Sequence, residues 1–294
     1  MPYYLLLPLA AAILYTLSSM LVKRGFEEGA RTAPTFHLAN LMGALLFSPL
    51  FFVGRAAVPW TLIYQPLAVG ILIYVGGWFT FLAVHKGDVS LITPLLGTKV
   101  IIVAVAAFVI TGTAETWKLW TAAGLTALGI FVMGARNIRR QRNLLSPILL
   151  ALASAVAFGI SDVLLQKWAG AFGGFRFLAL MTATLALFTG IQCALQGINP
   201  FDIPAASRKW VVSSNGLLGL QAMMMALALA FFGDATGVNV VYGSRGLWSI
   251  VLVWLLGGFF DSAERKSPER VLLPRLAGAV LLAVAIVLAV AERS

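Results

Sequence analysis

Long apolar runs, each about as long as a bilayer is thick, dominate this sequence. A helix needs about 20 mainly apolar residues to cross the hydrocarbon core. Because connections such as 85–88 and 233–235 are very short, neighbouring helices must form antiparallel hairpins. We therefore predict an all-α integral membrane protein with ten transmembrane helices. The predicted spans are Tyr3–Val22, Pro34–Gly54, Pro66–Val84, Val89–Ile110, Trp117–Ala135, Pro147–Gln166, Phe175–Leu195, Trp210–Phe232, Thr236–Phe259 and Val271–Ala291.

The composition argues against the main soluble classes. Of 294 residues, 60% are hydrophobic and 11% are charged, whereas a soluble domain carries about 45–50% apolar and about 25% charged residues. The net charge is +10, but the basic residues lie in short clusters between apolar runs. A nucleic-acid binder would gather them on one surface. We expect a multi-pass protein of the cell membrane, plasma or inner, without a nucleic-acid partner.

The basic residues also predict an orientation. Most of them lie in the loops that follow the first, third, fifth, seventh and ninth spans. The positive-inside rule places such loops in the cytoplasm. It therefore puts the 137–143 loop in the cytoplasm and both termini outside.

The polar residues of the two halves match. Segments 85–88 and 231–234 precede the fourth and ninth spans, and both end in Gly-Asp. At the same offset, Gly97-Thr98-Lys99 matches Gly243-Ser244-Arg245. We predict two five-helix repeats, residues 1–143 and residues 144–294. Because five is odd, the second repeat enters the membrane from the opposite side, as in secondary transporters whose substrate site lies between the halves near the midplane.

This arrangement resembles the drug/metabolite transporter superfamily, in its ten-helix form with two EamA-type repeats. The resemblance covers essentially the whole chain. It is carried by the order of Gly-Asp, span, acidic residue and span over Gly87–Gly134, with a second trace over Gly233–Leu288. It implies a secondary transporter with both termini in the cytoplasm. That orientation conflicts with the charge distribution, so the sequence leaves the orientation open.

Two cations lie near the middle of predicted spans, Lys99 in the fourth and Arg245 in the ninth. A charge at that depth costs about 2.5–3.5 kcal/mol and usually faces a bundle interior or an aqueous cavity. Asp162 is the one obvious intramembrane acid and can neutralise one of them. Convergent cations would bind a carboxylate or phosphate. The alternative is purely structural pairing.

Further candidates share helical faces with one another. His37 and Asn40 lie three residues apart, Tyr74 and Trp78 four apart. Asn239 and Tyr242 lie on the face that leads to Arg245. Ordinary helix packing competes with a binding role for all of the aromatic residues. The predicted substrate-binding residues are Lys99, Arg245, Tyr242, Asn239, Trp78, Tyr74, His37 and Asn40, with Asp162 for proton coupling.

Small residues predict close helix contacts, for example at Gly124 and Gly129. In membranes, glycine lets helix backbones approach each other closely. We expect these contacts to serve helix packing. Closely packed helices of this kind are also the surfaces that slide past each other in a rocking motion.

The predicted function is secondary transport of a small organic metabolite, anionic or zwitterionic, such as an amino acid or organophosphate. Transport would proceed by alternating access, through exchange or ion coupling. We expect no enzyme, metal or cofactor, because catalytic pairs and a phosphate-binding loop are absent from the sequence. The alternatives are an exporter of cationic or aromatic compounds, such as drugs or quaternary ammonium ions, and a lipid scramblase or channel. Both monomer and homodimer are open.

Overall fold

The computed structural model describes residues 2–86, 95–112, 115–134, 145–256 and 272–293. All regular secondary structure in these ranges is helical, which confirms the all-α expectation. The α-helices are α1 Leu6–Glu27, α2 Thr32–Phe47, α3 Leu50–Val53, α4 Tyr64–Lys86, α6 Lys99–Thr111, α7 Trp117–Gly134, α8 Leu145–Trp168, α9 Phe175–Gln196, α10 Ala205–Phe232, α11 Ala235–Tyr242, α12 Arg245–Leu256 and α13 Leu272–Arg293. Short 3₁₀ turns occur at Tyr3–Leu5, Trp60–Leu62 and Ala169–Phe172.

Six helical segments in the described ranges are long and apolar enough to cross a membrane. They are Tyr3–Glu27, Thr32–Val53, Trp60–Thr80, Leu145–Phe172, Phe175–Gln196 and Ala205–Phe232. The chain is therefore a multi-pass helical membrane protein. The other four predicted spans coincide with α6, α7, the α11–α12 pair and α13, and remain predictions as spans.

The bundle exposes many large apolar side chains, and its interior combines a few large rings such as Phe47 and Phe172 with many small or polar residues. Phe52, Val109 and Leu195 are among the large residues exposed on the outside, at 84%, 72% and 78%. The interior instead contains many Ala, Ser and Thr side chains. Large exposed apolar surfaces suit contact with lipid, and small interior residues let membrane helices pack closely.

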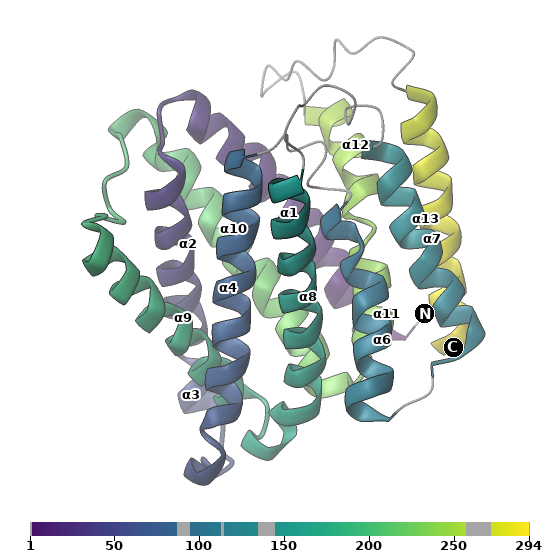
Figure 1. The fold of residues 1–294 in the computed structure, drawn as a ribbon, viewed down its shortest axis with the longest axis horizontal. Helices are drawn as coiled ribbons and strands as arrows, with labels where there is room; N and C mark the ends of the chain where they lie inside the picture. Colours follow the sequence, from purple (N-terminus) through teal and green to yellow (C-terminus); the bar gives the residue numbers. More distant parts are fainter. Residues whose placement is uncertain (1, 87–94, 113–114, 135–144, 257–271, 294) are drawn as a thin grey trace.

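Helices from the first half of the sequence pack mainly against helices from the second half (Figure 1). Helix α1 packs mainly on α10, and α4 packs mainly on α8. Helices α7 and α13 form one edge of the bundle, and α2 and α9 form the opposite edge. The short helix α11 lies against α6. The helices that begin at Lys99 and Arg245 therefore lie in the part of the bundle shared by both halves.

The ninth predicted span is two helices, because the chain tightens at Gly243 and Ser244. Ser244 donates its N–H to Val241 at 3.0 Å and Gly246 donates to Gly243 at 3.2 Å, which are 3₁₀-type bonds. A Cβ at Gly243 would lie 2.5 Å from the Thr126 side chain, so the close approach to α7 needs glycine. The uniform apolar character of the segment concealed this break.

Hydrogen bonds close the end of the bundle at which α1 begins. The Tyr4 hydroxyl donates to Asp234 at 2.6 Å. The Gln166 amide donates to the Gly233 carbonyl at 2.9 Å and accepts from the Ala235 N–H at 2.8 Å. These bonds join α8 and the segment before α1 to the turn between α10 and α11. We call this the Tyr4 end.

The two glycines that the sequence singled out on α7 differ in their surroundings. A Cβ at Gly129 would lie 2.9 Å from the Gly278 carbonyl oxygen and 3.1 Å from Leu282, both on α13. A Cβ at Gly124 would meet no described atom within 4 Å. The expectation of a close contact is therefore confirmed at Gly129 and wrong at Gly124, where the facing surface is open.

This difference predicts opposite effects on stability. We expect Gly129→Ala to destabilise the protein by about 1–3 kcal/mol, because the backbone of α13 must move. Gly124→Ala should be neutral or stabilise by about 0.5–1 kcal/mol, because alanine favours the helix over glycine. Thermal unfolding of the two variants in detergent measures this. Equal losses at both positions would contradict the α7–α13 packing.

Candidate functional site

Lys99 and Asp162 form an ion pair inside the bundle. The Lys99 Nζ lies 2.7 Å from the Asp162 Oδ2, and the two side chains are 19% and 13% exposed. The same carboxylate oxygen accepts a hydrogen bond from Asn239 Nδ2 at 2.8 Å. Lys99 also lies 5.7 Å from the centre of the Phe158 ring. The Asp162 carboxylate therefore neutralises the charge of Lys99 within the protein, and Asn239 helps to hold that carboxylate in place.

Arg245 has a different environment. Its guanidinium lies 5.0 Å from the centres of two rings, Tyr15 on α1 and Tyr242 on α11. The two rings meet edge to face at 6.1 Å. No ion pair in the described part of the chain includes Arg245. Cation–π contacts hold a guanidinium in place without cancelling its charge, so Arg245 keeps a positive charge.

One turn of α11 connects these two cations. Asn239, which bonds Asp162, and Tyr242, which contacts Arg245, lie three residues apart and so share a face of the helix. The Thr16 hydroxyl donates to the Arg245 carbonyl at 3.4 Å, which ties α1 to the start of α12. The structure thus joins five of the predicted residues and one more into a continuous group. We call it the charged site: Tyr15, Lys99, Asp162, Asn239, Tyr242 and Arg245.

The hydroxyl of Ser244 adds a polar group beside Arg245. Ser244 is 1% exposed, and its Oγ has no hydrogen-bond partner among the residues that the structure describes. Thr98, which precedes Lys99, instead bonds the Leu95 carbonyl at 2.6 Å. A buried hydroxyl without a partner costs free energy. Ser244 therefore has a buried donor that no described residue accepts.

His37, Tyr74 and Trp78 meet in a separate aromatic cluster. His37 stacks on Trp78 at 6.3 Å, and Phe36 lies 6.1 Å from Trp78 and 6.2 Å from Tyr74. Phe188 of α9 contacts Tyr74 at 5.7 Å. Within the described ranges, neither ring nitrogen of His37 nor the Tyr74 hydroxyl has a hydrogen-bond partner. We call these five residues the aromatic cluster.

Asn40 has a bond of its own outside this cluster. It lies one turn after His37 on α2, and its amide donates to the Thr189 hydroxyl of α9 at 3.2 Å. This bond fastens the two helices at the edge of the bundle. Asn40 therefore has a structural contact, and its predicted role in binding stays a prediction.

Two glycines of α4 separate the aromatic cluster from the charged site. A Cβ at Gly76 would lie 3.2 Å from Phe158, the ring beside Lys99. A Cβ at Gly77 would lie 3.1 Å from Phe36 of the aromatic cluster. Glycine at both positions lets a ring from each group pack against the α4 backbone, so the two groups are neighbours across α4.

Sequence reasoning missed three residues of this region, namely Tyr15, Phe158 and Ser244. Each is an ordinary residue in an apolar segment of the sequence, and none carries a charge that would have marked it. Ser244 stood in the matched Gly-Ser-Arg segment, which was the available signal. Tyr15 and Phe158 could be found only by knowing which helices pack together.

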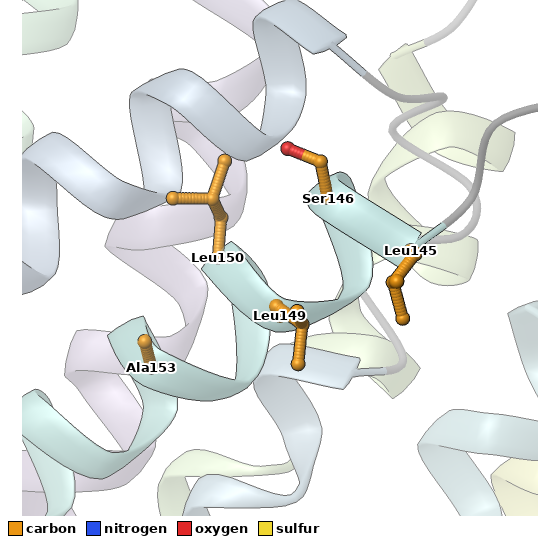
Figure 2. A pocket seen from close by; sticks show the side chains of 5 residues that line it. All are labelled: Leu145, Ser146, Leu149, Leu150 and Ala153. Atoms are coloured by element: carbon orange, nitrogen blue, oxygen red, sulfur yellow. The ribbon is translucent and has the colours of Figure 1, made fainter.

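A shallow apolar recess lies elsewhere, along the start of α8 (Figure 2). It has a volume of about 400 Å³ and its lining contains a single hydroxyl. Its residues are Leu145, Ser146, Leu149, Leu150 and Ala153. Two of the leucines, Leu145 and Leu149, are 71% and 56% exposed, so the recess belongs to the apolar outer surface. It supplies no charge for recognising a polar metabolite.

Comparison with known proteins identifies the fold only. No protein family and no curated protein matches the chain by sequence. A solved structure, described only as the crystal structure of a protein, superposes with a TM-score of 0.74 over 99% of each chain, at 16% sequence identity. The whole helical arrangement is thus found in another protein.

The buried pair predicts a rescue by double substitution. Lys99→Gln should destabilise the protein by about 3–5 kcal/mol, because it leaves Asp162 without its counter-ion. Adding Asp162→Asn should restore stability to within about 1 kcal/mol of the wild type, because a neutral pair needs no compensation. A double-mutant cycle from thermal unfolding measures this coupling. Additive losses would show that the two side chains do not interact.

Proposed function

We propose that this chain is a secondary transporter of the drug/metabolite transporter superfamily, with two inverted EamA-type repeats in the cell membrane. Its substrate is a small organic metabolite, anionic or zwitterionic, which it moves by alternating access without catalysing a reaction. The observation that carries the proposal is Arg245, a cation that lies against two tyrosine rings among apolar helices. A free charge at such a place marks a substrate pathway by default.

The packing supports two inverted repeats and ten spans. In the proposed repeats, α1 corresponds to α8 and α4 corresponds to α10. The contact of α1 with α10 therefore has an equivalent in the contact of α8 with α4, and both are principal contacts of the bundle. The pairs α7–α13 and α2–α9 map onto themselves. Helices α6 and α12 also begin at the matched cations, Lys99 and Arg245. Interrupted helices at matching positions of two halves are typical of transporter binding sites.

Alternating access requires that each end of the bundle can open and close. At the Tyr4 end the bonds of Tyr4 and Gln166 link α1 and α8 of different halves to the start of α11. At the other end Arg31 and Asp202 form an ion pair between the start of α2 and the segment before α10. Exchange of these contacts can accompany transport. Rocking of one repeat against the other would break them in turn.

The charged site favours an anionic group on the substrate. Arginine binds a carboxylate or phosphate through two parallel hydrogen bonds. An amino acid or an organophosphate would present such a group. Asp162, as the counter-ion of Lys99, is the group we propose for proton coupling.

The aromatic cluster favours a second candidate, the export of aromatic or cationic compounds. The rings of Phe36, Tyr74 and Trp78 lie close enough to offer stacking or cation–π contacts. Because α4 lies between the charged site and the aromatic cluster, such a ligand would bind on the opposite side of α4 from Lys99. No observation favours a channel or lipid scramblase, and substrate-dependent counterflow distinguishes a carrier from both.

The test of the proposed function is Arg245→Gln in proteoliposomes. We expect it to reduce anion-driven counterflow by at least about tenfold, because the loss of one charge-assisted hydrogen bond costs about 1.5–3 kcal/mol. The matched control is Lys118→Gln, which removes a cation paired with Glu292 at 3.0 Å on the outer helices α7 and α13. The control should transport like the wild type.

The double variant Lys99→Gln with Arg245→Gln extends this test. It should abolish anion transport. Because Lys99→Gln alone is expected to lower the stability, size-exclusion chromatography and the unfolding temperature must show that the double variant is folded under the assay conditions. Undiminished transport of every anion by this variant would contradict the proposal. Stabilisation of the wild type by cations alone would favour the second candidate.

A further inference from the structure

The matched cations have unequal partners. Asp162 of α8 neutralises Lys99, whereas the described residues supply no acid to Arg245. When the two repeats are aligned so that Lys23 matches Lys167, Asp162 of the second repeat aligns with Ser18 of the first. Ser18 is bonded to the carbonyl and hydroxyl of Ser214, each at 3.0 Å. The two halves therefore differ at the one position that decides whether a cation is compensated.

This difference fixes the charge of the site. Among the residues that the structure describes, two cations and one carboxylate leave a single positive charge, located at Arg245. Asn239, which bonds Asp162, lies one turn of α11 from Tyr242, which contacts Arg245, and charges interact more strongly in the protein interior than in water. A ligand with one negative charge brings the site to neutrality. A ligand with two leaves a net negative charge, and a zwitterion leaves the positive charge uncompensated.

We propose that Asp162 is the residue that determines substrate charge, and that it makes the site selective for monocarboxylates over dianions and zwitterions. This inference rests on the proposed function and narrows its substrate class. Organophosphates and zwitterionic amino acids become poor substrates, because each leaves an uncompensated charge in a buried site.

The geometry around Arg245 suits a carboxylate in particular. A guanidinium and a carboxylate are both planar and pair through two hydrogen bonds. The rings of Tyr15 and Tyr242 both contact the guanidinium. The buried hydroxyl of Ser244, the preceding residue, can donate a further bond to the carboxylate. A monocarboxylate uses all of these donors and needs no second cation.

The experiment compares three probes of nearly equal size with the purified full-length protein. Succinamate carries one negative charge, succinate carries two, and 4-aminobutyrate is a zwitterion. Apparent affinities come from the rise in unfolding temperature with probe concentration, since a ligand that binds the folded state stabilises it. The wild type should bind succinamate most tightly.

Substitutions that change the site charge should reorder the probes. Asp162→Asn raises the charge by one unit, so succinate should overtake succinamate, with the ratio of affinities changing on the order of tenfold. Lys99→Gln lowers the charge by one unit, so 4-aminobutyrate should be preferred. The matched control is the double variant Lys99→Gln with Asp162→Asn, which restores the net charge and should keep the wild-type order.

The outcomes distinguish this inference from the proposed function. If Asp162→Asn and Lys99→Gln both keep the wild-type order of probes, the charge-selecting role of Asp162 is wrong, although transport through Arg245 stands. If Arg245→Gln binds succinamate as tightly as the wild type, the anion site is wrong, and with it the proposed function. If the double variant Lys99→Gln with Asp162→Asn loses the wild-type order of probes, selectivity depends on the geometry of the Lys99–Asp162 pair and not on its charge. That result would also overturn the inference.

Discussion

A charge buried among apolar helices must be neutralised or used. Among the residues that the structure describes, Lys99 is neutralised by Asp162, and we propose that Arg245 is used to bind a substrate. Desolvation makes an isolated ion expensive inside a membrane. The ion pair with Asp162 offsets this desolvation free energy for Lys99, and Asn239 donates a hydrogen bond to the same carboxylate. For Arg245 two aromatic rings offset it, and they hold the ion but leave its charge. The proposed function follows from that remaining charge.

The helices that carry these ions are interrupted where the ions lie. Helix α12 begins at Arg245 after the Gly243–Ser244 turn, and α6 begins at Lys99 after Thr98. A Cβ at Gly243 would lie 2.5 Å from the Thr126 side chain, so glycine lets this turn pack closely against α7.

The sequence predicted the fold class and the centre of the site because those depend on strong local signals. Apolar length predicted the helices, and two mid-span cations with one acid predicted Lys99, Asp162 and Arg245. The partners Tyr15, Phe158 and Ser244 could not be predicted, since they depend on which helices meet. The break at Gly243 and the open space at Gly124 were also missed, because a glycine alone does not show whether a neighbouring helix lies against it.

The central claim is that Arg245 holds the substrate's negative charge. The most direct measurement is a crystal structure of the protein with bound 4-bromobenzoate, whose bromine is located by anomalous scattering. The account predicts the carboxylate within hydrogen-bonding distance of the Arg245 guanidinium, with Ser244 as a second donor. A ligand bound in the aromatic cluster around Trp78, with its carboxylate away from Arg245, would contradict it.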